Sequence, residues 1–155
     1  MTINQAAETW NLKKEKILKL IYEEKISDIT INDNRIIIPN RKEPFIIPNS
    51  AKKTTVNIYK YIVKAIDNDK YLDRFSFGNW DITEDEFDEF INQLVINGYV
   101  SKNSNYENTH STMNLYLTIP GLKFKNDILK SSSKRILEKY GLEIIKLGLL
   151  LISRI

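Results

Sequence analysis

The sequence predicts a mainly α-helical protein with small β hairpins, a fold of the α+β class. Apolar residues recur at helical spacing in several stretches, and short β-branched runs flank clusters of Asn and Asp. Only five Gly and four Pro occur among 155 residues, so the connections between elements should be short. A chain of this length holds one ordinary domain or two small ones.

The composition excludes several classes of chemistry. The chain has no Cys, which rules out disulfides, thiol catalysis and cysteine-ligated zinc, and we predict a cytoplasmic protein. Its start, MTINQAAETW, lacks the basic residues and apolar run of a signal peptide. The single histidine, His110, lies in the polar run NYENTHSTMN and is expected to be a solvated loop residue. We therefore predict no enzymatic activity, cofactor or metal site.

The net charge of +3 is unevenly distributed along the chain. Residues 1–53 carry ten Lys and Arg against seven Asp and Glu, and residues 123–155 carry eight against three. Residues 54–122 carry five against ten. Such asymmetry often separates a segment that binds nucleic acid from one with another role.

The opening stretch NQAAETWNLKKEKILKLI predicts two helices hinged at Trp10–Asn11. Thr2 is positioned to cap the first helix, and the second should run from Lys13 to Glu24. Ala7 allows a close helix crossing, and Asn11 tolerates a left-handed corner. The apolar face of the second helix is formed by Ile17, Leu20 and Ile21. Packing of that face turns four side chains outward: Lys13, Lys14, Lys16 and Lys19.

A β hairpin is predicted after these helices. Asn32-Asp33-Asn34 separates ITI from RIIIP, and Asn and Asp accept the positive φ of a tight turn. FIIP, Phe45 to Pro48, adds a further strand or a packed arm. The run IPNSAKKTT then predicts a domain boundary before the next helical pattern.

These features together resemble the excisionase-type, MerR-related helix-turn-helix with a small wing, over about Met1 to Pro48. TINQAAETWNLKKEKILKLIYEEKI, followed by NRIIIP, carries an Ala-Ala pair, an aromatic-polar corner, a basic second helix and a strand pair ending in Ile-Pro. The corner has Asn11 in place of Gly, and the second helix has Lys in place of Arg. The resemblance implies that the second helix enters the major groove of double-stranded DNA. The hairpin would act as a wing, with Arg35 on phosphate.

The middle of the chain predicts two further helices. The first is TTVNIYKYIVKAI, with its apolar residues at helical spacing: Val56, Tyr59, Ile62, Val63 and Ile66. An irregular or short helical passage follows, and its Phe75 and Trp80 are expected in the core rather than in a partner groove. Thr83 and Glu86 form a capping box for the second helix, which Gly98 ends. The apolar residues of that helix are Phe87, Phe90, Ile91, Leu94 and Val95.

YVSKNSNYENTHSTMNLYLT then reads as strand, polar loop and strand, and LTIPGLKF opens another helix. Over about residues 54–127 the chain resembles the YjcQ-like winged-helix family. The matching positions are Thr83, Phe87, Leu94, Gly98, Tyr99, Leu117, Thr118 and Gly121. The fold predicted for the whole chain is therefore two winged helix-turn-helix-like domains and a C-terminal helix.

The helix that begins after Thr83 has the wrong charge for DNA. Its first turns carry Glu84, Asp85, Glu86, Asp88 and Glu89, which would repel phosphates. We predict instead that Glu84, Asp85, Asp88 and Glu89 contact a protein partner. Asp85 and Glu89 share a helix face, but no EF-hand spacing, histidine or glycine-rich loop accompanies them to indicate a metal or catalytic site.

The tail from Leu142 to Ile155, LEIIKLGLLLISRI, is too short and too charged to span a bilayer. Self-association as a homodimer through a helix over residues 133–155 is favoured, with Leu147, Leu150 and Leu151 in the contact. Packing on its own domain and contact with a membrane surface are the alternatives, and a membrane partner is not expected.

The predicted domains are residues 1–50, which bind DNA, residues 54–127, and the apolar helix over residues 133–155. The predicted function is DNA binding in transcription regulation or as an excisionase-like factor of a mobile genetic element. The alternative is a protein-binding adaptor that uses the acidic helix. A membrane-surface protein held by its tail is a third hypothesis.

Overall fold

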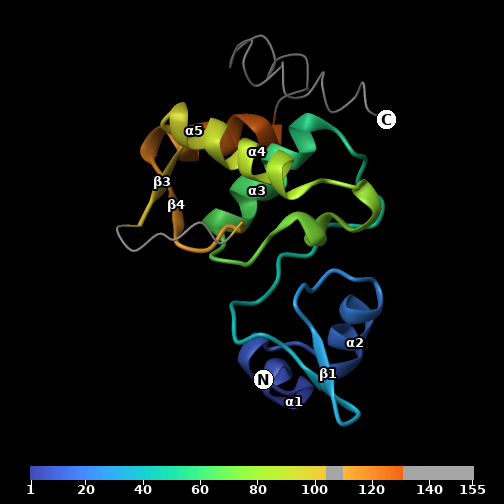
Figure 1. The fold of residues 1–155 in the computed structure, drawn as a ribbon. Helices are drawn as coiled ribbons and strands as arrows, with labels where there is room; N and C mark the ends of the chain where they lie inside the picture. The colour runs from blue at the N-terminus through green and yellow to red at the C-terminus, as the bar shows by residue number, and fades with distance from the viewer. Residues whose placement is uncertain (104–109, 131–155) are drawn as a thin grey trace.

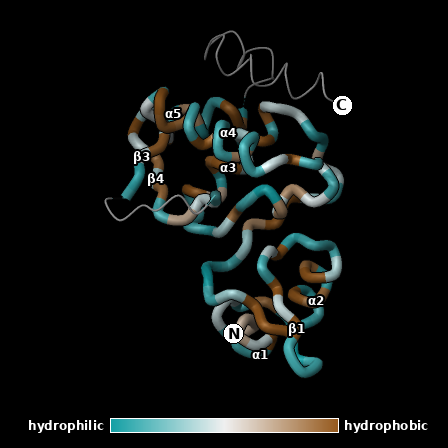
Figure 2. Tube along the Cα trace, viewed as in Figure 1, coloured by the Kyte–Doolittle hydropathy of each residue, from teal (hydrophilic) through white to brown (hydrophobic). Residues whose placement is uncertain are grey.

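The computed structural model describes residues 1–103 and 110–130 (Figure 1). That part of the chain contains five α-helices, one 3-10 helix and two antiparallel two-stranded sheets. The α-rich composition with small hairpins agrees with the predicted α+β class. Hydrophobic stretches occur in two separate clusters, one near the N-terminus and one in the larger remainder (Figure 2).

The N-terminal elements are two helices followed by a hairpin. Helix α1 spans Ile3–Trp10 and helix α2 spans Lys14–Tyr22. Strand β1, Thr30–Asn32, pairs with strand β2, Arg35–Ile37. Thr2 caps α1 through a capping box with Gln5, as the N-cap prediction requires. Asp33 and Asn34 have φ values of 48° and 62°, which confirms the predicted hairpin turn.

These elements enclose a small core of their own. The fully buried members come from both helices, the loop after α2 and the end of the hairpin: Ala6, Trp10, Ile17, Leu20, Ile26 and Ile38. The N-terminal ammonium of Met1 donates to the Ile38 carbonyl at 2.5 Å, and the Ile38 amide donates back to Met1 at 2.8 Å. Ala6 has no exposed surface and Ala7 is half-buried against the same core, so the close helix crossing predicted at Ala7 stays a prediction.

The larger unit contains three α-helices and the second hairpin (Figure 1). Helix α3 spans Thr55–Asp67, helix α4 spans Glu84–Ile96 and helix α5 spans Ile119–Lys130. The 3-10 segment η1, Arg74–Trp80, lies between α3 and α4 in sequence. Strand β3, Val100–Lys102, pairs with strand β4, Leu115–Leu117, in the register Val100 opposite Leu117. The predicted strand, polar loop and strand are thus confirmed at their ends, while residues 104–109 lie outside the described part.

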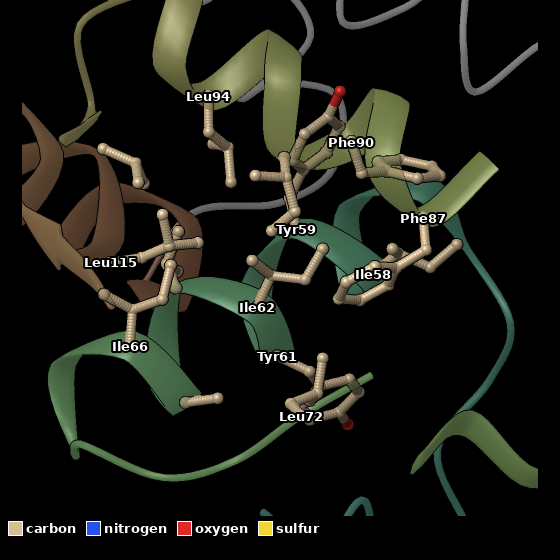
Figure 3. Packing of buried hydrophobic residues seen from close by; sticks show 14 of the residues in the cluster. Ile58, Tyr59, Tyr61, Ile62, Ile66, Leu72, Phe87, Phe90, Leu94 and Leu115 are labelled. Atoms are coloured by element: carbon tan, nitrogen blue, oxygen red, sulfur yellow. The ribbon is translucent and has the colours of Figure 1, made fainter. Parts of the chain in front are cut away.

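Helix α3 is the centre of the larger core (Figure 3). Its Tyr59 ring meets Phe90 of α4 edge-on at 4.8 Å and Phe124 of α5 at 6.4 Å. The sequence predicted a single apolar face, but Ile58, Tyr61 and Ala65 are buried as well. The reason is that α4, α5 and the segment after α3 together cover more than one side of this helix.

The aromatic passage after α3 differs from its prediction at Phe75. This side chain is 43% exposed, with the Arg74 guanidinium 4.4 Å from the ring centre, whereas Phe77 is buried. Trp80 is half-buried and packs on the core as expected. Gly78 breaks the helical geometry of η1 with φ 60° and ψ −125°, so helical spacing did not indicate which ring faces inward.

The chain passes from the β3–β4 hairpin into α5 through a close backbone contact, which explains the Leu-Thr-x-x-Gly pattern. Thr118 Oγ1 accepts from the Gly121 amide at 3.1 Å and donates to the Gly98 carbonyl at 2.5 Å. A Cβ on Gly121 would lie 1.8 Å from the backbone oxygen of Tyr99. Only glycine therefore fits where α5 begins against this backbone.

An extended segment joins the two clusters. The Phe45 amide donates to the Tyr71 carbonyl at 2.7 Å, and the Tyr71 amide donates to the Glu43 carbonyl at 2.9 Å. Phe45 and Ile47 pack on the larger core, while Ile46 between them packs on the N-terminal core. The predicted strand or arm is thus a packed arm whose alternate side chains enter different cores.

A buried polar network adds to this junction. The Arg41 side chain is only 7% exposed, and its Nη1 and Nη2 donate to Ser27 Oγ at 2.8 Å and to the Ser27 carbonyl at 2.5 Å. Ser27 Oγ donates in turn to Asp73 Oδ2 at 2.7 Å, and the Tyr71 hydroxyl donates to the same oxygen at 2.9 Å. Burial, and then the charge of Asp73, raises the pKa of Tyr71, which keeps this donor protonated.

We predict that Arg41→Ala lowers the free energy of unfolding by about 2–3 kcal/mol, because hydrogen bonds to a charged group contribute about that much when their partner becomes unsatisfied. Arg41→Lys should recover little of it, since an ammonium cannot reproduce the two-nitrogen contact with Ser27. Urea denaturation monitored by circular dichroism measures the change. The control is Arg35→Ala, whose side chain is exposed. Equal stability of the Arg41→Ala and Arg35→Ala variants would contradict the prediction.

Candidate nucleic-acid interface

The corner between α1 and α2 is the feature that orients the basic helix. Asn11 has φ 52° and ψ 42°, the left-handed conformation predicted for it. Leu12 then donates its amide to the Ala7 carbonyl at 3.1 Å, and Lys13 is extended at φ −69° and ψ 144° before α2 begins. The opening stretch is therefore two helices, as predicted, with α2 two residues shorter than expected at its end.

Packing of Ile17 and Leu20 fixes the rotation of α2 about its axis. Both are buried at 2% exposure or less, so the opposite side of the helix faces solvent. All four predicted lysines are exposed: Lys13, Lys14, Lys16 and Lys19. Lys19 lies 4.0 Å from Glu23 one turn later, a separation that contributes little stability at a surface. Three of these lysines therefore lie at exposed positions of α2 and Lys13 lies at its N-cap, with Glu15 between Lys14 and Lys16, which point to different sides of the helix.

Two apolar side chains on the same exposed surface were missed by the sequence reasoning. Leu18 is 45% exposed and Tyr22 is 89% exposed. With Lys14 they stand at i, i+4 and i+8, so they form one row along α2. The four-residue spacing is visible in the sequence, but the sequence does not show which apolar residues of this helix stay exposed. An exposed Leu and Tyr in such a row suit contact with thymine methyl groups and bases.

The hairpin supplies the remaining predicted contact. Arg35 is exposed and is the first residue of β2, directly after the turn at Asp33 and Asn34. The hairpin projects away from the larger unit (Figure 1). Ile31 is 75% exposed and Ile37 is 40% exposed, so the hairpin has apolar surface beside Arg35.

The C-terminal end of α2 faces the larger unit. Tyr22 and Glu24 line a surface hollow together with Phe75 and Asn79 of η1. The end of α2 that carries Lys13, Lys14 and Lys16 is the end remote from this contact. Access for a nucleic acid is therefore greatest at the N-terminal half of α2.

Three of the four acidic residues of α4 that were predicted to contact a partner make contacts within the chain. His110 Nδ1 lies 2.6 Å from Asp88 Oδ2, and its Nε2 lies 3.2 Å from Glu84 Oε1. The expectation that His110 is only a solvated loop residue was therefore wrong, because its ring contacts two carboxylates of α4. Glu89 Oε1 accepts from Gln93 Nε2 at 2.9 Å, whereas Asp85 is exposed. Contact of Glu84, Asp85, Asp88 and Glu89 with a protein partner stays a prediction.

The predicted contact residues of the tail, Leu147, Leu150 and Leu151, lie outside the described residues, as does the whole predicted helix over residues 133–155. Among residues 1–103 and 110–130, the structure contains no helix with the length and hydropathy needed to cross a membrane.

Comparison of the chain with protein-family models, curated proteins and solved structures found no match. The resemblances to the excisionase and MerR-related proteins and to the YjcQ-like family therefore stay predictions from the sequence. What the structure adds is the order of helix, left-handed corner, helix and hairpin in the first 37 residues.

We predict that Asn11→Ala destabilises the N-terminal unit by about 1 kcal/mol, because alanine has no local hydrogen bond to offset the left-handed conformation. Asn11→Gly should keep wild-type stability, since glycine adopts positive φ without steric strain. Hydrogen exchange at the amides of α1 and α2 reports this local stability separately from the larger core. Equal exchange rates in the alanine and glycine variants would show that the left-handed corner does not control the stability of the N-terminal unit.

Proposed function

We propose that this protein binds duplex DNA through α2 and the β1–β2 hairpin, as a transcription regulator or a mobile-element factor of the excisionase type. The observation that carries the proposal is the orientation of α2. The Asn11 corner and the buried Ile17 and Leu20 leave four exposed lysines, with Lys13 just before α2 and the other three distributed around its solvent-exposed sides. A recognition helix of this class lies in the major groove with its N-terminal residues nearest the base edges, and that is the end where three of these lysines lie.

The lysines and Arg35 would act mainly on phosphates. A lysine ammonium is a compact point charge, while bidentate contact with guanine is better suited to arginine. Phosphate contacts fix position and orientation, whereas base contacts specify sequence. Sequence preference would then come from Lys14 and Leu18, since Tyr22 lies at the end of α2 that faces the larger unit, with the hairpin as a wing that places Arg35 on the backbone.

The larger unit supports this function without entering the groove. Helix α4 begins with three successive carboxylates, Glu84, Asp85 and Glu86, which disfavour an approach to phosphate. The basic excess of residues 1–53 and the acidic excess of residues 54–122 orient the N-terminal unit toward DNA. The adaptor alternative has less support, because Glu84, Asp88 and Glu89 already have partners within the chain.

Self-association through the apolar C-terminal segment completes the proposal. Proteins with one helix-turn-helix per chain commonly dimerise, which places two reading heads about one helical turn apart on the duplex. Leu147, Leu150 and Leu151 belong to the most apolar run of the chain. Two copies would double the number of phosphate contacts on one DNA segment.

We predict that the protein binds a mixed-sequence duplex with an affinity that falls steeply with salt. Five phosphate contacts per chain contribute about −4.5 to the slope of log K against log salt, at roughly −0.9 per contact, so a bound dimer should give about −9. The double variant Lys13→Glu plus Lys16→Glu should bind more weakly, with the slope reduced in magnitude by about 2 per bound chain. Fluorescence anisotropy of labelled DNA over a salt series measures both quantities.

The matched control is Lys123→Glu plus Lys130→Glu, which makes the same charge change at exposed positions of α5. It should leave most of the affinity and the slope intact. If the two double variants lose affinity equally, the binding depends on net charge and not on α2. If Lys13→Glu plus Lys16→Glu binds like wild type, the proposed reading head is wrong.

We predict that Leu150→Lys plus Leu151→Lys converts a dimer into a monomer, because two buried charges in an apolar contact are strongly unfavourable. Sedimentation equilibrium measures the mass. Ser132→Lys plus Ser133→Lys adds the same charge outside the apolar run and should remain dimeric. A wild-type chain that sediments as a monomer would exclude this mode of association.

A further inference from the structure

Three side chains with metal-ligating atoms meet at the N-terminal end of α4. Glu84 and Asp88 lie one helical turn apart on the same face, and His110 approaches them from the segment before β4. One ligand atom from each of the three residues lies within 4.8 Å of the other two. These residues come from segments more than twenty positions apart, so the fold, not local sequence, brings them together.

The surrounding structure holds both sides of this cluster in place. The capping box of Thr83 and Glu86 fixes the first turn of α4, with Thr83 Oγ1 accepting from the Glu86 amide at 3.1 Å. On the other side, the two residues after His110 are buried. Thr112 donates its amide to the Leu72 carbonyl at 3.0 Å, and its Oγ1 accepts from the Leu72 amide at the same distance. The imidazole therefore extends from an anchored segment toward a fixed helix turn.

We propose that Glu84, Asp88 and His110 form a binding site for a divalent transition-metal ion, with Zn²⁺ as the best-suited probe. One imidazole nitrogen and two carboxylate oxygens are a ligand set that Zn²⁺ accepts, at bond lengths near 2.0–2.2 Å. Ligands on a tetrahedral ion at that distance are roughly 3.4 Å apart, so side-chain rotation is enough to close the site from its present separations.

Binding exchanges one contact for another in this cluster. The two ring nitrogens of His110 now face different carboxylates, and only one of them can face a given ion. One ring nitrogen binds the ion, and Glu84 and Asp88 both leave the ring to turn to it, so the three residues supply one nitrogen and two carboxylate oxygens. The second ring nitrogen is then left facing solvent, where water can act as its orienting partner.

The site would be open to solvent on one side. The side chains of His110 and Glu84 are 40% and 48% exposed, and that of Asp88 is 22% exposed. Glu84 and His110 also border a cavity of about 200 Å³ whose wall includes Asp28, Asp73 and Arg74. Three protein ligands beside a water-accessible cavity leave a coordination position for water, in contrast to a closed structural zinc site.

The test uses the tag-free full chain, in which His110 is the single histidine. Titration with Zn²⁺ should shift the imidazole resonances in the NMR spectrum at one ion per chain. Isothermal titration calorimetry should give the same stoichiometry, and Tm should rise by roughly 5–10 °C at a hundredfold excess of Zn²⁺ over Kd. His110→Gln and Glu84→Gln should each weaken Zn²⁺ binding at least about tenfold and reduce the rise in Tm.

The matched controls are Asp81→Asn and Asp85→Asn, which remove exposed carboxylates beside the cluster. They should keep wild-type affinity, and circular dichroism should show that every variant remains folded. Unchanged imidazole resonances in the presence of Zn²⁺ would overturn the proposal. So would a His110→Gln variant that binds Zn²⁺ as tightly as wild type, or an Asp85→Asn variant that loses as much affinity as Glu84→Gln.

Discussion

The arrangement of the whole chain depends on the junction formed by Arg41 and the arm that follows it. The N-terminal core contains only six buried apolar residues, too few for a unit of this size to be strongly stable alone. The arm compensates because alternate residues enter both cores, with Ile46 on one side and Phe45 and Ile47 on the other. The buried contacts of Arg41 with Ser27, and of Ser27 with Asp73, then fix the angle between the units. These contacts thereby fix the orientation of helix α2 relative to the larger unit.

The separation of charge between the units follows from the demands of their helices. Helix α2 begins without a side-chain cap and carries lysines at its exposed positions, which favour an external anion more than the helix itself. Helix α4 has a complete capping box and three carboxylates in its first turn, which stabilise its own N-terminus. Helix α2 and helix α4 are each the second α-helix of their unit, and they present opposite charge to solvent. That contrast is why DNA contact is proposed for α2 and not for α4.

Features set by a few neighbouring residues could be predicted from the sequence. The Thr2 and Thr83 caps, the Asn11 corner and the turn at Asp33 and Asn34 all depend on local backbone chemistry. Features set by tertiary packing could not be predicted. Three features depend on neighbours distant in sequence: the deeper burial of Ala6 than of Ala7, the exposure of Phe75 and the burial of α3 on several sides. For the candidate interface, the exposure of the lysines followed from helical spacing. The approach of His110 to α4 did not, because a polar loop gives no sign of where it will dock.

The junction and the Glu84–Asp88–His110 cluster are linked by shared surroundings. The cavity beside Glu84 and His110 is also lined by Ser27, Tyr71 and Asp73, which belong to the network that fixes the N-terminal unit. A positive charge gained or lost at the cluster changes the electrostatic potential at Asp73, and so the strength of its contact with Ser27. The network of Ser27, Tyr71 and Asp73 and the cluster of Glu84, Asp88 and His110 therefore border one cavity, although the exposed lysines of α2 and the carboxylates of α4 lie in different units.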